Sequence, residues 1–194
     1  MRPDRIIFDK MCLDAIRSPV SALVGAKKKD MKKTWMVLAE GSAFFGFAAM
    51  FVFIMRNQSW LPAVASALTV FLTVFVIAIV LGYMLKIIAT TLGGKGGFYH
   101  GVTCIAYPLA PMGLAMLVAA VASPFPGGVV VSSLALAIGF SMGISMLYRA
   151  VRELFAVDMV TSLVALSILI IVLFIASSVS TGLSTIANLG SLVI

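Results

Sequence analysis

The chain has 194 residues, of which 62% are hydrophobic and 11% are charged, and its mean hydropathy is +1.16. Soluble domains are roughly 45 to 50% apolar and about 25% charged, so this composition excludes an ordinary soluble domain and indicates an integral membrane protein. The formal net charge is +7. Cys12 lies in the polar N-terminal part and Cys104 in an apolar run, without the spacing of a zinc site or of a disulfide framework. We therefore expect no metal or other cofactor.

Residues 1–34 are the longest polar stretch and are predicted to form a cytoplasmic basic tail. Residues 4–17 place apolar and charged side chains on opposite sides of a helical wheel, which is typical of an amphipathic helix in the headgroup layer. The alternative is that the apolar side packs on the protein's own loops. A lysine cluster then precedes the first apolar run: Lys27, Lys28, Lys29, Lys32 and Lys33. It would attract anionic lipid headgroups at about 1 kcal/mol per residue, or serve only as a topology signal. Nucleic acid is not an expected partner.

Five apolar runs are long enough, or nearly so, to cross about 30 Å of hydrocarbon at ~20 residues each. They comprise residues 35–55, 61–88, 101–122, 128–148 and 159–180. The prediction is an all-α membrane domain over residues 35–180, followed by a short outer tail at residues 181–194. Thirteen Lys and Arg residues fall on the side of the N-terminus, against Arg56 alone on the other side. This asymmetry predicts a cytoplasmic N-terminus and a C-terminus outside.

Residues 82–111 join the second apolar run to the third and organise the chain. Four glycines surround Lys95 and disfavour a continuing helix, so the chain is expected to turn back at Gly93, Gly94, Gly96 and Gly97. Pro108 and Pro111 fall inside the third apolar run. Because each removes a backbone donor, this helix is predicted to be kinked or broken.

Glu40 is the only acidic residue within the predicted spans, where an unpaired carboxylate costs a few kcal/mol. Lys86 falls near the cytoplasmic end of the second span, at a similar expected depth. We therefore predict an intramembrane pair between Glu40 and Lys86. Such a pair would fix the helix register or belong to a proton or solute pathway.

The fourth apolar run carries a stripe of small residues at four-residue spacing, Ala135, Gly139 and Gly143, which lets another helix approach closely. It predicts an internal helix contact, with an oligomer contact as the alternative. Ser141 completes a G-x-S-x-G pattern, but it lies in an apolar helical run, and the single histidine, His100, is expected about two turns nearer the cytoplasmic side. We expect no catalytic residues and no enzyme.

In its order of short motifs, the chain resembles the Yip family, five-span proteins named for interaction with Ypt/Rab GTPases. The resemblance runs from about Pro19 to the fifth run and includes a basic connection around Arg149. The motif residues are Gly82, Tyr83, Gly93, Gly94, Gly101, Tyr107, Leu109 and Pro111. The short N-terminal part lacks the Asp-Leu-Tyr-Gly-Pro-like motif of eukaryotic members, so the chain is more similar to the compact archaeal and bacterial members.

The resemblance implies a non-enzymatic membrane protein that organises membrane or protein assemblies, related to trafficking factors. The implied partners are the lipid bilayer, other membrane proteins or a second copy, and Rab-type GTPases. The implied location is the ER or Golgi in a eukaryote and the cell membrane in a prokaryote. The alternative function is a small transporter, channel or lipid conduit that uses the region of Glu40 and Lys86.

Overall fold

The computed structural model describes residues 31–56 and 59–172. Four of its helices are long and apolar enough to cross a membrane: α3 (Met31–Met55), α4 (Trp60–Thr91), α5 (Phe98–Ala122) and α6 (Gly128–Leu154). A shorter apolar helix, Met159–Val172, follows α6. Each of the five predicted runs therefore overlaps a described helix, the fifth over residues 159–172. Four possible spans are confirmed, while the fifth crossing and the orientation of the termini stay predictions.

Several predicted features lie outside the described residues. They are the amphipathic helix at residues 4–17, Cys12, the first three lysines of the basic cluster (Lys27, Lys28 and Lys29), the end of the fifth run and the tail at residues 181–194. Lys32 and Lys33 are described and lie exposed in the first turn of α3.

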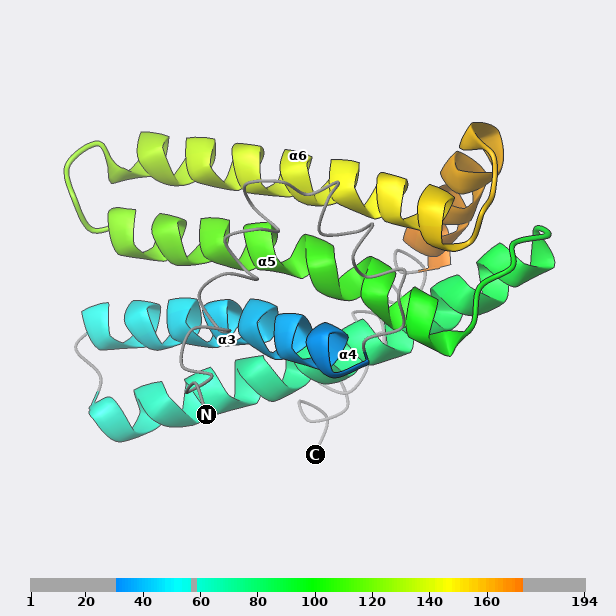
Figure 1. Cartoon of the computed structure of the whole chain (residues 1–194). Coiled ribbons are helices and arrows are strands. Elements are labelled where there is room, and N and C mark those ends of the chain that lie inside the picture. Colours follow the sequence, from blue (N-terminus) through cyan, green and yellow to red (C-terminus); the bar gives the residue numbers. More distant parts are fainter. Residues whose placement is uncertain (1–30, 57–58, 173–194) are drawn as a thin grey trace, which may run out of the picture.

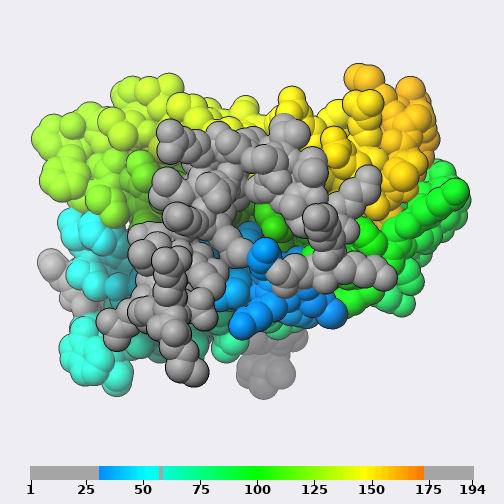
Figure 2. All heavy atoms as spheres, in the orientation of Figure 1, coloured from blue at the N-terminus to red at the C-terminus, as the bar shows by residue number. Residues whose placement is uncertain are grey.

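Helix α5 lies at the centre of the bundle, with α3 on one side and α6 on the other (Figure 1). Along α3 and α5, Thr34 contacts Thr103 and Gly41 faces Ala110, so these two helices run in the same direction. Figure 2 shows α6 along one edge of the molecule and the start of α4 along the opposite edge. We call the end of the bundle with the glycine loop (residues 92–97) the loop end, and the other end the far end.

The glycine loop turns the chain as predicted and also contacts the end of α6. Gly93 has a φ of +89°, a left-handed conformation that glycine adopts readily. The backbone N–H of Lys95 donates a 2.9 Å hydrogen bond to the carbonyl oxygen of Phe155. A Cβ on Gly96 would run into the ring of Phe155, whose side chain is fully buried. The loop therefore encloses Phe155 and ties the α4–α5 connection to α6.

This helix was predicted to be kinked or broken at the two prolines, and the break does not occur: α5 continues without interruption through Pro108 and Pro111 (Figure 1). The first turns of α5 are inclined to the remainder in that view. Both prolines are buried within the bundle, and the Pro111 carbonyl oxygen faces Gly139 of α6. Neighbouring helices thus support the segment where two helical hydrogen bonds are missing, as membrane-spanning helices allow.

Candidate functional site

A cluster of hydroxyl groups joins α3 to α5 near the loop end. The Thr34 hydroxyl lies 3.2 Å from the Tyr99 hydroxyl and 3.1 Å from the Thr103 hydroxyl. Thr103 in turn donates a 2.8 Å hydrogen bond to the Tyr99 carbonyl oxygen. Thr34 and Thr103 are buried. In an apolar surrounding, the contacts of the Thr34 hydroxyl with α5 favour one register of the two helices.

Glu40 lies on α3 beyond this cluster, with 7% of its surface exposed. Its Oε2 atom has no hydrogen-bond partner among the described residues. The neighbouring Gly41 faces Leu109 and Ala110 of α5 so closely that a Cβ there would be 3.0 Å from the Leu109 Cβ. Glu40 is thus an acidic group at depth, beside the tight α3–α5 contact.

The structure does not bring Lys86 to Glu40. The Cβ of Lys86 lies beside Gly101, about eight residues before the part of α5 that Gly41 meets. At 1.5 Å per residue this separates the two levels by about 12 Å along α5. No ion pair joins the two side chains in the described part of the chain. The predicted depths of Glu40 and Lys86 were counted from the ends of the apolar runs. Helix α4 extends beyond its run to Thr91, and Lys86 lies near the loop end of this helix.

Lys86 instead lies against an aromatic pair at the loop end. Its Nζ is 5.7 Å from the centroid of the Tyr83 ring. That ring is 6.2 Å from the ring of Phe98, the first residue of α5. Tyr83 is 50% exposed and Phe98 is 37% exposed. This arrangement places a cation and two aromatic rings at the outer surface where α4 meets α5.

Close contacts explain why glycine stands at several of the motif positions. Gly82 and Gly101 lie where α4 and α5 touch, and a Cβ on Gly82 would be 2.7 Å from the Val102 Cα. A Cβ on Gly94 would be 2.7 Å from the Ala89 carbonyl oxygen. Tyr107 is buried in α5, between the hydroxyl cluster and Pro111.

The small-residue stripe of α6 faces α5, in agreement with an internal contact. A Cβ on Gly139 would collide with the Ala115 Cβ, and one on Gly143 with the Met112 side chain. Ala135 lines a 180 Å³ groove between the same two helices. In this structure the stripe therefore brings α6 onto α5.

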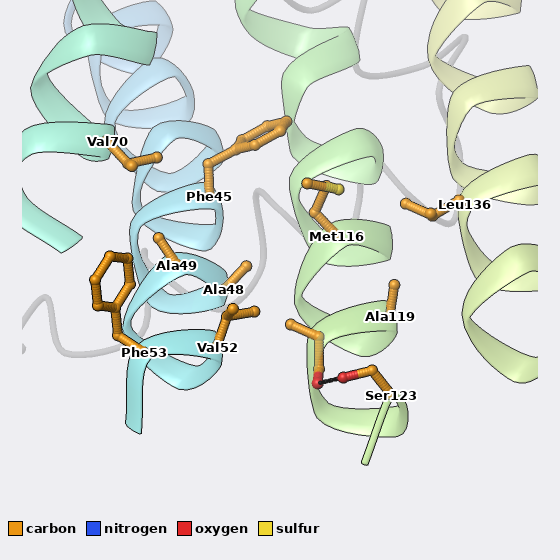
Figure 3. Close-up of a pocket in the computed structure, with 11 residues that line it drawn as sticks. Phe45, Ala48, Ala49, Val52, Phe53, Val70, Met116, Ala119, Ser123 and Leu136 are labelled. Carbon is orange, nitrogen blue, oxygen red and sulfur yellow. Dashed lines mark hydrogen bonds between the residues drawn. The ribbon is translucent and has the colours of Figure 1, made fainter. Parts of the chain in front are cut away.

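A larger apolar cavity of about 490 Å³ lies toward the far end, between α3 and α5 (Figure 3). Val70 of α4 and Leu136 of α6 complete its lining. Its polar lining residue is Ser123, whose hydroxyl donates a 2.9 Å hydrogen bond to the Ala120 carbonyl oxygen. Such a lining offers hydrocarbon contact and no reactive group.

Among residues 31–56 and 59–172, no group of three His, Cys, Asp or Glu side chains could hold a metal ion. Cys104 is a buried free thiol. The contacts described above hold the helices together. The polar groups described above do not pair a nucleophile with an adjacent base.

Four long apolar helices, with α5 at their centre, define an integral, multi-pass α-helical membrane protein. The Yip1 domain model matches residues 21–180, and the chain belongs to the Yip1 domain family. The family acts in membrane trafficking and is not known for enzymatic activity. The match confirms the resemblance that the motifs between Gly82 and Pro111 indicated. No curated protein and no solved structure matches the chain.

Proposed function

We propose that the chain is a non-enzymatic adaptor that organises membrane or protein assemblies at its loop end, and that this end faces the cytoplasm. The observation that carries the proposal is the distribution of charge in the described residues. Arg56 belongs to the far end, whereas six cations belong to the loop end: Lys32, Lys33, Lys86, Lys95, Arg149 and Arg152. Cytoplasmic ends of membrane proteins are enriched in Lys and Arg in this way.

The proposal assigns a role to each part of the chain. Residues 1–34 are the recruiting segment, residues 35–180 are the membrane anchor, and residues 181–194 lie on the opposite side. The hydroxyl cluster and the contact of the loop with Phe155 make the loop end a fixed platform. A fixed, cationic platform suits the binding of acidic surfaces. The partner class is other membrane proteins or a second copy, with Rab-type GTPases suggested by the family.

We do not propose the conduit function. Two of its supports are missing: α5 is not broken at Pro108 and Pro111, and Glu40 and Lys86 start from different levels of the bundle.

The orientation is tested by cysteine labelling in intact cells, on a background in which Cys12 and Cys104 are replaced by serine. Lys95→Cys lies exposed in the glycine loop, and Ser59→Cys lies exposed at the start of α4. A membrane-impermeant maleimide should label Ser59→Cys in intact cells and Lys95→Cys only after permeabilisation. Labelling of Lys95→Cys in intact cells would refute the cytoplasmic loop end.

The adaptor role is tested by proximity labelling in cells that express the full chain or a variant lacking residues 1–30. The variant should lose the labelled neighbours of the full chain while reaching the same membrane in the same amount. Arg56→Gln, which removes a cation at the far end, is the matched control and should keep the neighbours. Unchanged neighbours in the truncated variant would refute a recruiting role for the tail.

A further inference from the structure

The structure leaves Tyr83 unexplained by packing. Its neighbour Gly82 is required by the contact with α5, but the Tyr83 ring is half exposed on the surface of α4. The ring contacts that are described join it to Phe98 and to the Lys86 ammonium. An aromatic side chain held at the surface in contact with a cation points to a ligand outside the protein.

The length of α4 indicates where this group lies relative to the bilayer. The helix has 32 residues and is therefore about 48 Å long, well over the roughly 30 Å of the hydrocarbon core. Trp60 is the first residue of α4 and is 72% exposed, so it serves as an interfacial anchor at the far end. About 20 residues counted from Leu61 reach the neighbourhood of Leu81. Tyr83 and Lys86 consequently lie at the headgroup layer of the loop-end leaflet.

The Lys86 ammonium has three donors and no carboxylate partner in the described residues. Thr90 and Thr91 donate their hydroxyls to carbonyl oxygens of their own helix, and as neutral groups they cannot balance the charge of the ammonium. The Tyr83 ring attracts the ammonium but does not neutralise it. An acceptor with a negative charge is therefore the missing partner, and the headgroup layer supplies phosphate.

The backbone holds the base of the Lys86 side chain. Gly82 and Gly101 touch, and the Lys86 Cβ would lie 3.2 Å from a Cβ placed on Gly101. The α4–α5 contact thus fixes the stem of Lys86 and the Phe98 ring relative to each other. This part of the site is in place before a ligand arrives, which favours selective binding.

We propose that Lys86, Tyr83 and Phe98 form a binding site for the phosphate of an anionic phospholipid in the leaflet at the loop end. The ammonium contacts the phosphate oxygens, and the two rings contact the glycerol and upper acyl region. A zwitterionic headgroup carries its own cation next to the phosphate, so a headgroup with net negative charge binds better. The site requires the membrane location alone and does not depend on the adaptor role.

The test uses the full chain in phosphatidylcholine vesicles with trace spin-labelled phosphatidylglycerol or phosphatidylcholine. Electron spin resonance gives the ratio of the two lipids in the motionally restricted population. Lys86→Gln should lower the preference for phosphatidylglycerol about fivefold, the ratio that one headgroup contact supplies. Lys86→Arg should keep it, and Tyr83→Leu should lower it in part, because the ring positions the ammonium. Equal elution volume and melting temperature of the variants show that they are folded.

The matched control is Lys95→Gln, which removes an exposed cation of the same end from the glycine loop. This variant should keep the preference of the wild type. An equal loss in Lys95→Gln would mean that general surface charge selects the lipid, and it would overturn the site. An unchanged preference in Lys86→Gln would also overturn it. Millimolar glycerol 3-phosphate should not displace the labelled lipid, and displacement would overturn a lipid site in favour of a soluble anion.

Discussion

Gly82 of α4 and Gly101 of α5 meet backbone to backbone, and a Cβ on Gly101 would collide with the Gly82 carbonyl oxygen. Small residues allow such close approach, and in a membrane the packing it creates replaces the hydrophobic driving force between helices. Both glycines belong to the family motif. Gly82 precedes the glycine loop and Gly101 follows it. Their contact therefore sets the distance between the two helices that the loop connects.

Gly101→Ala should therefore lower the free energy of unfolding by about 1 to 3 kcal/mol, the usual cost of overpacking at a site whose neighbour is backbone. The measurement is thermal unfolding in detergent. Gly97→Ala is the control, because its φ is −93° and a Cβ there would meet His100 Nδ1 at an ordinary 3.9 Å. If the two variants unfold at the same temperature, the close α4–α5 contact is not formed.

The contact of Gly96 with Phe155 predicts coupling between two positions far apart in the sequence. Phe155→Ala removes a fully buried ring and should cost about 3 to 5 kcal/mol. Gly96→Ala alone should also destabilise, since its Cβ would enter the ring. In the double variant the obstacle is absent, so the added alanine should cost almost nothing. Thermal unfolding of the four proteins gives the cycle, and simple additivity would contradict the contact.

The starts of α4, α6 and the helix Met159–Val172 fall within one residue of the predicted runs, because polar or glycine-rich residues bound these runs, whereas α5 begins at Phe98, three residues before its run. The run at 159–180 begins at Met159, where the helix begins. The turn at the glycine loop was also predictable, from the backbone freedom of Gly93 and Gly94. What glycine spacing could not reveal was the contact of the loop with Phe155, since that contact joins residues about 60 positions apart.

The polar groups were harder to place. Glu40 and Lys86 could be singled out from the sequence, but their relative depth depends on where α4 ends and on its contact at Gly101. The hydroxyl cluster was missed. Tyr99, Thr103 and Tyr107 recur at four-residue spacing, which places them on one side of a helix and is the signal that could have found it. The partner Thr34 follows only from the parallel packing of α3 on α5.

Thr34 in this cluster should contribute measurably to stability. Thr34→Val keeps the shape of the side chain and removes the hydroxyl that lies near Tyr99 and Thr103. Interhelical hydrogen bonds in membrane proteins are worth about 0.6 kcal/mol on average and up to about 1.7 kcal/mol, so a loss in this range is expected. Thr69→Val is the matched control, because the exposed Thr69 donates only to Ala65 of its own helix. A Thr34→Val protein as stable as the control would show that the cluster does not hold α3 to α5.

Asp158 caps the helix Met159–Val172 and should make its first turn sensitive to acid. Its Oδ2 accepts hydrogen bonds from the backbone N–H groups of Val160 at 3.1 Å and Thr161 at 3.4 Å. Hydrogen bonding, first from the Thr161 side chain and then from these N–H groups, holds the Asp158 pKa below its usual value. Because the folded pKa is the lower one, the cap's contribution is complete above the unfolded pKa of about 3.9 and is lost as the pH falls through the folded value.

Hydrogen exchange of the Val160 and Thr161 amides, corrected for intrinsic rates, should accelerate over that acidic range in the wild type. Asp158→Asn keeps an acceptor without a titrating charge and should show protection that does not change with pH, whereas the same acid response in both proteins would exclude Asp158 as its source.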